Sequence, residues 1–143
     1  MTPTRVITAS GESSLKVWDA KSPEHPLIHT FSDAHPLGVH HVVVDLDDGS
    51  TTAASSGFGQ ELVIWDLVEE KEKLRLQSGE NGSRDIIGEA WALSLSPDGK
   101  TLYSTTHDGR VNVWDTLSLK KIAQIETKGS FGTSIACVRS PPF

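Results

Sequence analysis

The stretch AWALSLSPDGKTLYSTTHDGRVNVWD, residues 90–115, contains three short apolar segments separated by two tight turns. Ser96-Pro97-Asp98-Gly99 is typical of a turn, because proline presets φ, aspartate bonds its own backbone and glycine accepts a positive φ. His107-Asp108-Gly109 predicts a second turn, which leads into a segment that ends in Trp114-Asp115. The stretch therefore predicts three antiparallel strands, at residues 90–95, 102–106 and 111–115.

The Trp-Asp ending recurs along the chain. SLKVWD ends at Asp19, ELVIWD at Asp66 and VNVWD at Asp115, so the tryptophans are 47 and 49 residues apart. A repeat of about 40 to 45 residues with this signature is typical of WD-repeat β-propellers. We therefore predict an all-β fold, a partial WD-repeat β-propeller of about three blades. The predicted blade units are residues 1–38, 39–88 and 89–132, with the start of a fourth blade at 133–143.

The same alignment predicts the remaining strands. They are residues 6–10, 15–18, 27–31, 39–44, 52–56, 62–65, 74–77, 121–126 and 134–137. The first blade then lacks its innermost strand, and both ends of the chain break at the same point of the repeat, which suggests a piece of a larger ring. Because a blade is covered by its neighbours, we expect the two outer faces to expose apolar patches and strand edges. We expect residues 1–143 alone to aggregate or to stay partly molten.

The composition narrows the function classes. The formal net charge of −6 argues against a protein that binds a phosphate backbone, and no basic run offsets it. Cys137 is the single cysteine, so no internal disulfide can form, and the start does not resemble a signal peptide. No apolar run approaches the roughly 18 residues of a membrane span. These features favour a reducing compartment. We expect a protein of the cytoplasm and nucleus that needs no cofactor.

Polar residues near each Trp-Asp pair predict a structural hydrogen-bond chain. In WD repeats a histidine, a hydroxyl, a turn aspartate and the tryptophan form such a chain, which fixes geometry and does no chemistry. The third blade offers Thr106 and Asp108, the first offers Ser10 and Glu12, and in the second Gly57 and Gly59 stand where the hydroxyl and carboxylate are expected; Ile86 occupies the third blade's histidine position. The predicted structural residues are Trp18, Asp19, Trp65, Asp66, Trp114, Asp115, His35, Thr106 and Asp108.

A cluster of histidines and carboxylates raises the question of a metal site. Its members are His35, His40, His41, Asp45, Asp47 and Asp48. Strand alternation places neighbouring histidines on opposite faces, and the aspartates at 47 and 48 are expected to form a turn, so we predict no metal site. No Ser-His-Asp or Cys-His arrangement is readable, and Gly57-Phe58-Gly59 is too short to indicate a phosphate-binding loop. No catalytic residue is predicted.

The longest and most polar connections all fall on one side of the predicted blades. The crossings at 33–38, 78–89 and 128–132 share that side with the turns at Glu12, Phe58 and His107, because alternate turns of an antiparallel meander lie together. Repeat proteins usually bind partners at such loops. The predicted partner-binding residues are Trp91, His40, Thr133 and His41. Trp91 belongs to no signature, so it is either a binding hot spot or ordinary packing.

Three segments carry a more particular resemblance. HPLGVHHVVVD (35–45), EAWALSLSPDGKTLYSTTHDGRVNVWD (89–115) and IETKGSFGTSIA (125–136) resemble, in order and spacing, the superkiller-eight family, the fungal WD-repeat subunit of the superkiller complex. The resemblance implies a seven-bladed, non-catalytic propeller that docks on a tetratricopeptide scaffold beside an RNA helicase and assists exosome-mediated 3′–5′ mRNA decay. It also implies binding to the protein that makes meiotic double-strand breaks, and partner peptides held near His40 and Trp91.

Other functions remain open at this point. One is an adaptor of a different complex, such as the transcription elongation complex that animal relatives of the family join. Another is a metal-dependent or hydrolytic enzyme that uses His35, His40 and His41. The third is direct RNA binding, which the acidic charge disfavours and a salt-dependent shift with short RNA would support. We expect protein partners, no direct nucleic-acid contact and no membrane.

Overall fold

The computed structural model describes residues 4–45, 51–78, 90–129 and 132–138, which contain strands and no helix. The strands form three antiparallel sheets in chain order. The first sheet contains β1 (Arg5–Ala9), β2 (Leu15–Asp19) and β3 (Leu27–Phe31). The second contains β4 (Val39–Val44), β5 (Thr52–Gly57), β6 (Glu61–Asp66) and β7 (Lys71–Gln77). The third contains β8 (Leu93–Leu95), β9 (Thr101–Thr105), β10 (Arg110–Asp115) and β11 (Lys120–Glu126).

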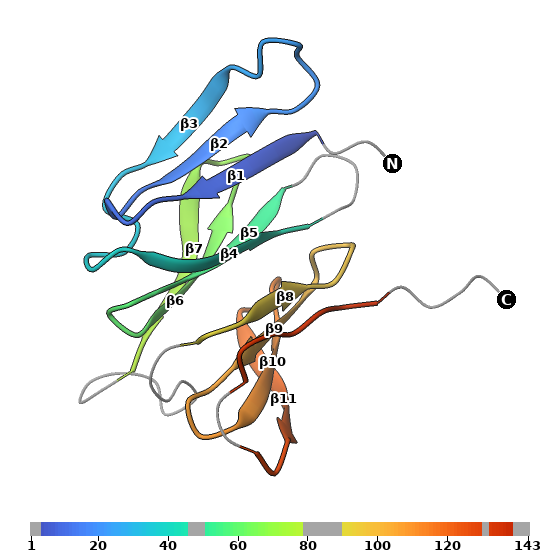
Figure 1. The fold of residues 1–143 in the computed structure, drawn as a ribbon. Coiled ribbons are helices and arrows are strands. Elements are labelled where there is room, and N and C mark those ends of the chain that lie inside the picture. Colours follow the sequence, from blue (N-terminus) through green and yellow to red (C-terminus); the bar gives the residue numbers. More distant parts are fainter. Residues whose placement is uncertain (1–3, 46–50, 79–89, 130–131, 139–143) are drawn as a thin grey trace, which may run out of the picture.

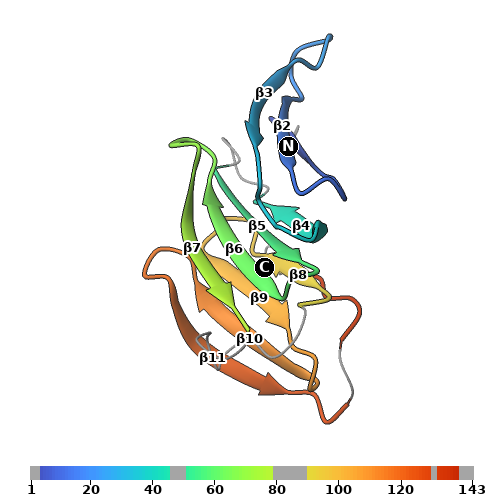
Figure 2. The ribbon, with the colours of Figure 1, turned by 90° about the vertical axis from the view of Figure 1, so that its left-hand side faces the viewer.

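The three sheets follow one another side by side as the blades of a partial propeller (Figure 1), which confirms the predicted fold class. Each sheet is a meander in which successive strands pair, and each is twisted (Figure 2). The connection from β3 to β4 and the turns β1–β2 and β5–β6 lie on the left-hand side of Figure 1. Backbone bonds from Phe58 N to Gly38 O (3.2 Å) and from Val39 N to Ser10 O (3.4 Å) join these connections into one rim.

The tryptophans of the second and third sheets each pack on the preceding sheet. Trp65 of β6 lies against Phe31 of β3, with ring centroids 4.6 Å apart, in a core that includes Leu15 and Val17 of the first sheet. Trp114 of β10 shares a second core with residues of the second sheet, Ala54, Leu62 and Ile64. Strand β6 is buried from Glu61 to Trp65, on both faces, as a sheet between two others requires.

Two strand predictions need correction. The predicted strand 90–95 is paired only over Leu93–Leu95. The predicted strand 134–137 has no ladder, and Cys137 N instead donates to the Ser94 hydroxyl at 2.9 Å. The other predicted strands are present, and the first sheet has three strands as expected, so the described residues hold eleven strands rather than twelve.

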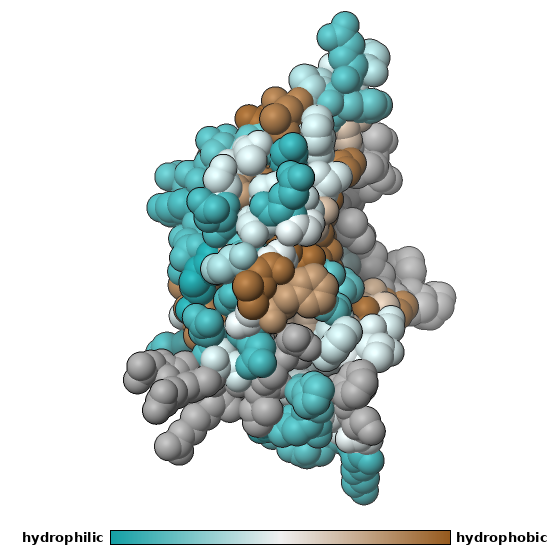
Figure 3. Space-filling view, turned by 60° about the vertical axis from the view of Figure 1, so that its left-hand side comes forward, coloured by the Kyte–Doolittle hydropathy of each residue, from teal (hydrophilic) through white to brown (hydrophobic). Residues whose placement is uncertain are grey.

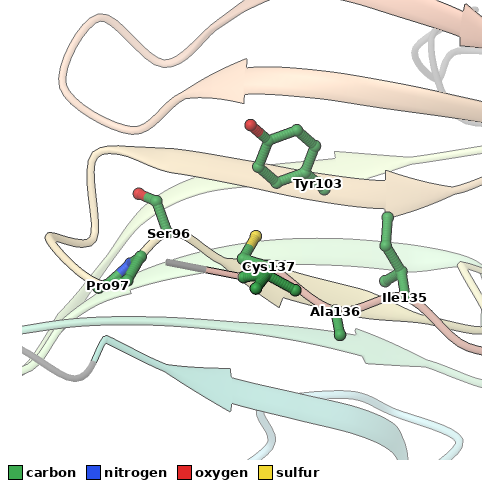
Figure 4. Close-up of a pocket in the computed structure, with 7 residues that line it drawn as sticks. Ser96, Pro97, Tyr103, Ile135, Ala136 and Cys137 are labelled. Atoms are coloured by element: carbon green, nitrogen blue, oxygen red, sulfur yellow. The ribbon is translucent and has the colours of Figure 1, made fainter. Parts of the chain in front are cut away.

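The two outer sheets present hollows. One, of about 320 Å³, lies beside the half-buried Trp18 and is lined by Val6, Thr8, Trp18, Asp19, Ala20 and His25. The other, also about 320 Å³, lies between the third sheet and the segment 135–138 (Figure 4), where the Cys137 thiol points toward the Tyr103 ring. The described residues include no helix that could span a membrane.

Candidate functional site

Every Trp-Asp repeat contains the same hydrogen bond, from the indole N–H to a hydroxyl ten residues earlier. Trp18 Nε1 donates to Thr8 Oγ1 at 2.9 Å, Trp65 to Ser55 Oγ at 2.8 Å and Trp114 to Ser104 Oγ at 2.9 Å. The strand register explains this geometry. In the third sheet Trp114 pairs with Leu102, and Ser104, two residues further on, lies on the same face of the hairpin.

The predicted hydroxyls were therefore placed two residues too late. Thr106 is not the partner of Trp114; its hydroxyl bonds the Asp108 carboxylate in the β9–β10 turn. Ser10 likewise bonds the backbone N–H of Glu12 (3.0 Å) and not Trp18. These residues stabilise the turns, whereas the hydroxyl that reaches the tryptophan comes from the middle of the neighbouring strand.

The second sheet extends this bond into a buried chain. His35 Nε2 lies 2.7 Å from Ser55 Oγ, and His35 Nδ1 lies 3.3 Å from Glu61 Oε2. Since Trp65 N–H donates to Ser55, the Ser55 hydroxyl can donate to Nε2, and the neutral His35 tautomer with its proton on Nδ1 then donates to Glu61. Burial is the largest influence on His35 and lowers its pKa, which favours this neutral form.

The expectation that Gly57 and Gly59 leave this chain without a hydroxyl and a carboxylate is wrong. Ser55 supplies the hydroxyl from within β5, and Glu61 supplies the carboxylate from the first position of β6.

Ser55, His35 and Glu61 also form a Ser-His-acid arrangement that the sequence did not reveal. The rival reading of a hydrolase would use such a set. Ser55 and His35 are 0% exposed, and the Trp65 N–H bonds the same Ser55 oxygen that would attack a substrate. No substrate can reach that hydroxyl in this geometry, so the set ties the β3–β4 crossing to the second sheet and does not act as a catalytic triad.

The aspartates of the Trp-Asp pairs cap the next turn in all three sheets. Asp66 Oδ1 accepts from Val68 N (2.9 Å) and Glu69 N (2.8 Å). The corresponding oxygens of Asp19 and Asp115 each accept from two backbone N–H groups in the same way. For Asp115, the bonds from Ser118 and Leu117 lower the carboxyl pKa, because they stabilise the charged form.

An aromatic cluster lies on the rim formed by the crossings. His40 is the extra residue of a β-bulge, since Val39 pairs with Gly57 and His41 with Ser56. Its ring contacts Trp91 edge-on, with centroids 4.6 Å apart at 87°, and contacts Phe58 at 5.0 Å and 65°. The bulge brings together two predicted binding residues, and strict strand alternation does not apply at this position.

The other two predicted binding residues lie differently. His41 is half-buried, and burial lowers its pKa even though its ring bonds the Trp91 backbone. Thr133 is exposed on the segment that follows the third sheet.

Sequence reasoning missed the two most exposed apolar side chains of the rim. Leu37 is 69% exposed and Phe58 is 47% exposed. The bond from Phe58 N to Gly38 O joins the turn that carries Phe58 to the crossing that carries Leu37, and Figure 3 shows an apolar patch near the middle of this side of the molecule. The sequence signal that could have identified Phe58 as exposed was its position in a turn, between Gly57 and Gly59. We name Leu37, His40, Phe58 and Trp91 the aromatic rim.

The histidine-carboxylate cluster is not assembled by the described residues. Asp45 accepts from Thr51 N at 3.2 Å, and no three His, Cys, Asp or Glu side chains in the described ranges are placed to hold a metal ion. Asp47, Asp48 and Ile86 lie outside the described residues.

Comparisons with known proteins agree with the repeat. The family model "WD domain, G-beta repeat" matches residues 80–115. The matched residues end at Trp114-Asp115, the third Trp-Asp pair of the chain. It is similar to the crystal structure of RRP9 WD40 repeats, with a TM-score of 0.73 over 93% of this chain and 38% of that one, at 17% identity. This likeness shows the fold alone.

Two curated relatives cover nearly all of this chain. Meiotic recombination protein rec14 of Schizosaccharomyces pombe is 39% identical over 128 residues, which is 90% of this chain and 40% of the relative. WD repeat-containing protein SL1-17 of Schistosoma mansoni is 29% identical over 93% of this chain and 41% of its own length. The chain thus spans about two fifths of the length of these relatives.

Proposed function

We propose that this protein is a non-catalytic scaffold whose aromatic rim binds a partner protein. The observation that carries the proposal is the exposed Phe58 ring against His40, which itself contacts Trp91, on the loop side of the sheets. The exposed Leu37 lies in the neighbouring crossing, next to Gly38, whose carbonyl accepts the Phe58 N–H. Buried aromatic anchors surrounded by polar residues are typical of interaction hot spots. A partner that inserts an apolar side chain here would cover the exposed area.

Similarity to known proteins supports two cellular settings for this scaffold. The likeness to a meiotic recombination protein at 39% identity supports a role in meiotic double-strand break formation. The resemblance of segments 35–45, 89–115 and 125–136 to the superkiller-eight family supports a second setting, as a subunit of a superkiller-type complex in exosome-mediated mRNA decay. In that setting the partners are a tetratricopeptide scaffold and a helicase, and the protein works in both cytoplasm and nucleus.

Co-purification of the tagged full-length protein tests the scaffold role. Phe58→Ala and Leu37→Ala should lower partner recovery, because they remove apolar contact area at the rim. Leu117→Ala is the matched control: Leu117 is 70% exposed, but it lies in the β10–β11 turn, on the other side of the sheets. Equal recovery from rim and control variants would contradict the proposal. The identity of the recovered partners, from vegetative and meiotic cells, separates the two settings.

A further inference from the structure

The β5–β6 hairpin of the second sheet (the second hairpin) and the β9–β10 hairpin of the third sheet (the third hairpin) hold a carboxylate at different distances along the chain from their tryptophans. In the third, Asp108 lies in the turn six residues before Trp114 and pairs with Arg110, four residues before it, at 2.8 Å from Arg110 Nε to Asp108 Oδ2. In the second, the position six before Trp65 is Gly59 and the position four before it is Glu61. The carboxylate of the second hairpin is thus two residues nearer to its tryptophan, and it lies in strand β6 instead of in the turn.

Glu61 occupies the space that side chains at 57 and 59 would need. A Cβ added at Gly57 would lie 2.7 Å from the His35 Cγ and closer still to the Glu61 carboxylate. A Cβ at Gly59 would lie 2.9 Å from the Glu61 Cδ. Contacts under 3.0 Å force a rearrangement, and Glu61 is only 3% exposed, so it has no free volume to enter. The two glycines and the glutamate therefore form one structural unit.

This unit lies directly behind the aromatic rim. Phe58 is the residue between the two glycines, and its N–H bonds the crossing at Gly38 O. Gly57 pairs with Val39, the residue before the bulge that turns His40 toward Phe58 and Trp91. Any shift of Glu61 toward the turn would thus displace the residues that set the His40–Phe58 contact.

We propose that Glu61 is a positioning residue of the partner-binding rim, a relocated carboxylate that fixes the 57–59 turn through His35 and so holds Phe58 against His40. Its relevance to binding rests on the proposed function. The positioning of the turn by Glu61 does not depend on the proposed function, because it is a property of the free protein. Gly57 and Gly59 are required because of Glu61, whereas in the third hairpin Asp108 fixes the turn through Thr106 and Arg110.

Replacing the Gly59 and Glu61 pair by the Asp and Arg pair of the third hairpin tests the proposal in the full-length protein. Glu61→Arg places an unpaired charge beside His35 and should lower the melting midpoint by roughly 10 °C. Gly59→Asp crowds Glu61 and should also lower it. The double variant Gly59→Asp/Glu61→Arg recreates the Asp-Arg pair of the third hairpin, so it should be more stable than either single variant. Purely additive losses, or a Glu61→Arg protein as stable as the parent, would overturn the proposal.

The His40 ring protons report the rim directly, because the Phe58 and Trp91 rings shift their resonances. Glu61→Leu leaves the His35 Nδ1–H without an acceptor and should move the His40 signals, whereas Glu61→Gln retains an acceptor oxygen and should leave them near their original positions. Asp108→Ala, in the third hairpin, is the matched control and should not move them. Unchanged His40 signals in a folded Glu61→Leu protein would refute the positioning role. If Phe58→Ala leaves partner recovery intact while these shifts occur, the proposed function fails and this inference stands.

Discussion

The first and second sheets contain the same tryptophan-hydroxyl bond in different surroundings. The bond lengths are 2.9 Å at Trp18 and 2.8 Å at Trp65. Trp18 is half-buried beside a hollow, whereas Trp65 is 4% exposed and packs on Phe31 of the preceding sheet. The comparison shows that hairpin register sets the hydrogen bond locally, while burial depends on a neighbouring sheet.

The largest expected effect is the loss of a tryptophan between sheets. Trp65→Ala should lower the free energy of unfolding by about 3–5 kcal/mol, because it opens a cavity in the shared core. Trp18→Ala should cost about 1–2 kcal/mol, since its ring is only partly buried and no preceding sheet covers it. Urea unfolding followed by circular dichroism measures both. Similar losses at the two positions would show that Trp18 is as well covered as Trp65 in solution.

Removing the hydroxyl that accepts the tryptophan N–H should also cost more in the second sheet than in the first. Ser55→Ala removes a group that bonds both Trp65 and His35, and should cost about 2–3 kcal/mol because two buried polar atoms lose their partner. Thr8→Ala should cost less than about 1 kcal/mol, because Thr8 is exposed and water can replace its hydroxyl. The same urea titration gives both values, and a larger loss for Thr8→Ala would contradict the assignment of the buried chain to the second sheet.

Acid should weaken the second sheet before the first. The pKa of His35 is lowered, mainly by burial, with Glu61 opposing and Arg75 adding to the shift and Glu72 opposing it more weakly. The unfolded state therefore binds a proton near its ordinary pKa of about 6.5 while the folded state does not, so stability is full above that pH and falls as the pH drops below it. His41 contributes in the same direction.

Urea midpoints between pH 7.5 and 5 measure this dependence. His35→Gln should reduce the slope, and His41→Gln should reduce it further. The carboxyls of Asp108 and Asp115, whose pKa values are lowered, lose their contribution only below about pH 4, outside this window. A flat profile in the parent protein would show that His35 titrates alike in both states.

The parts of this fold that repeat were predictable, and the parts that depend on contacts between sheets were not. The Trp-Asp period and the turn at 96–99 identified three sheets, because packing requires an indole at the same place in each. The bulge at His40 leaves no sequence signal, so the contact of His40 with Phe58 was missed.

Glu61 illustrates the same limit. A carboxylate four residues before the tryptophan gave no indication that it reaches back to His35, since that contact depends on two glycines in the preceding turn. Segment 134–137 has the composition of a strand, but among the described residues no strand pairs with it, and its Cys137 N–H instead bonds the Ser94 hydroxyl of β8. Strand propensity needs a partner ladder to become structure.

The smallest expected effect concerns one backbone position that all three hairpins share. The residue five before each tryptophan has a positive φ: 71° at Ser13, 67° at Gln60 and 86° at Gly109. Only the third hairpin has glycine, the residue that adopts this conformation without steric cost. Gln60→Gly and Ser13→Gly should therefore each stabilise the protein by about 0.5–1 kcal/mol, with Gln60→Ala as the control that removes the side chain without relieving the backbone. If the gain from Gln60→Gly appears but that from Ser13→Gly does not, the first sheet already unfolds separately from the other two, and the difference between the sheets extends from their tryptophans to their cooperativity.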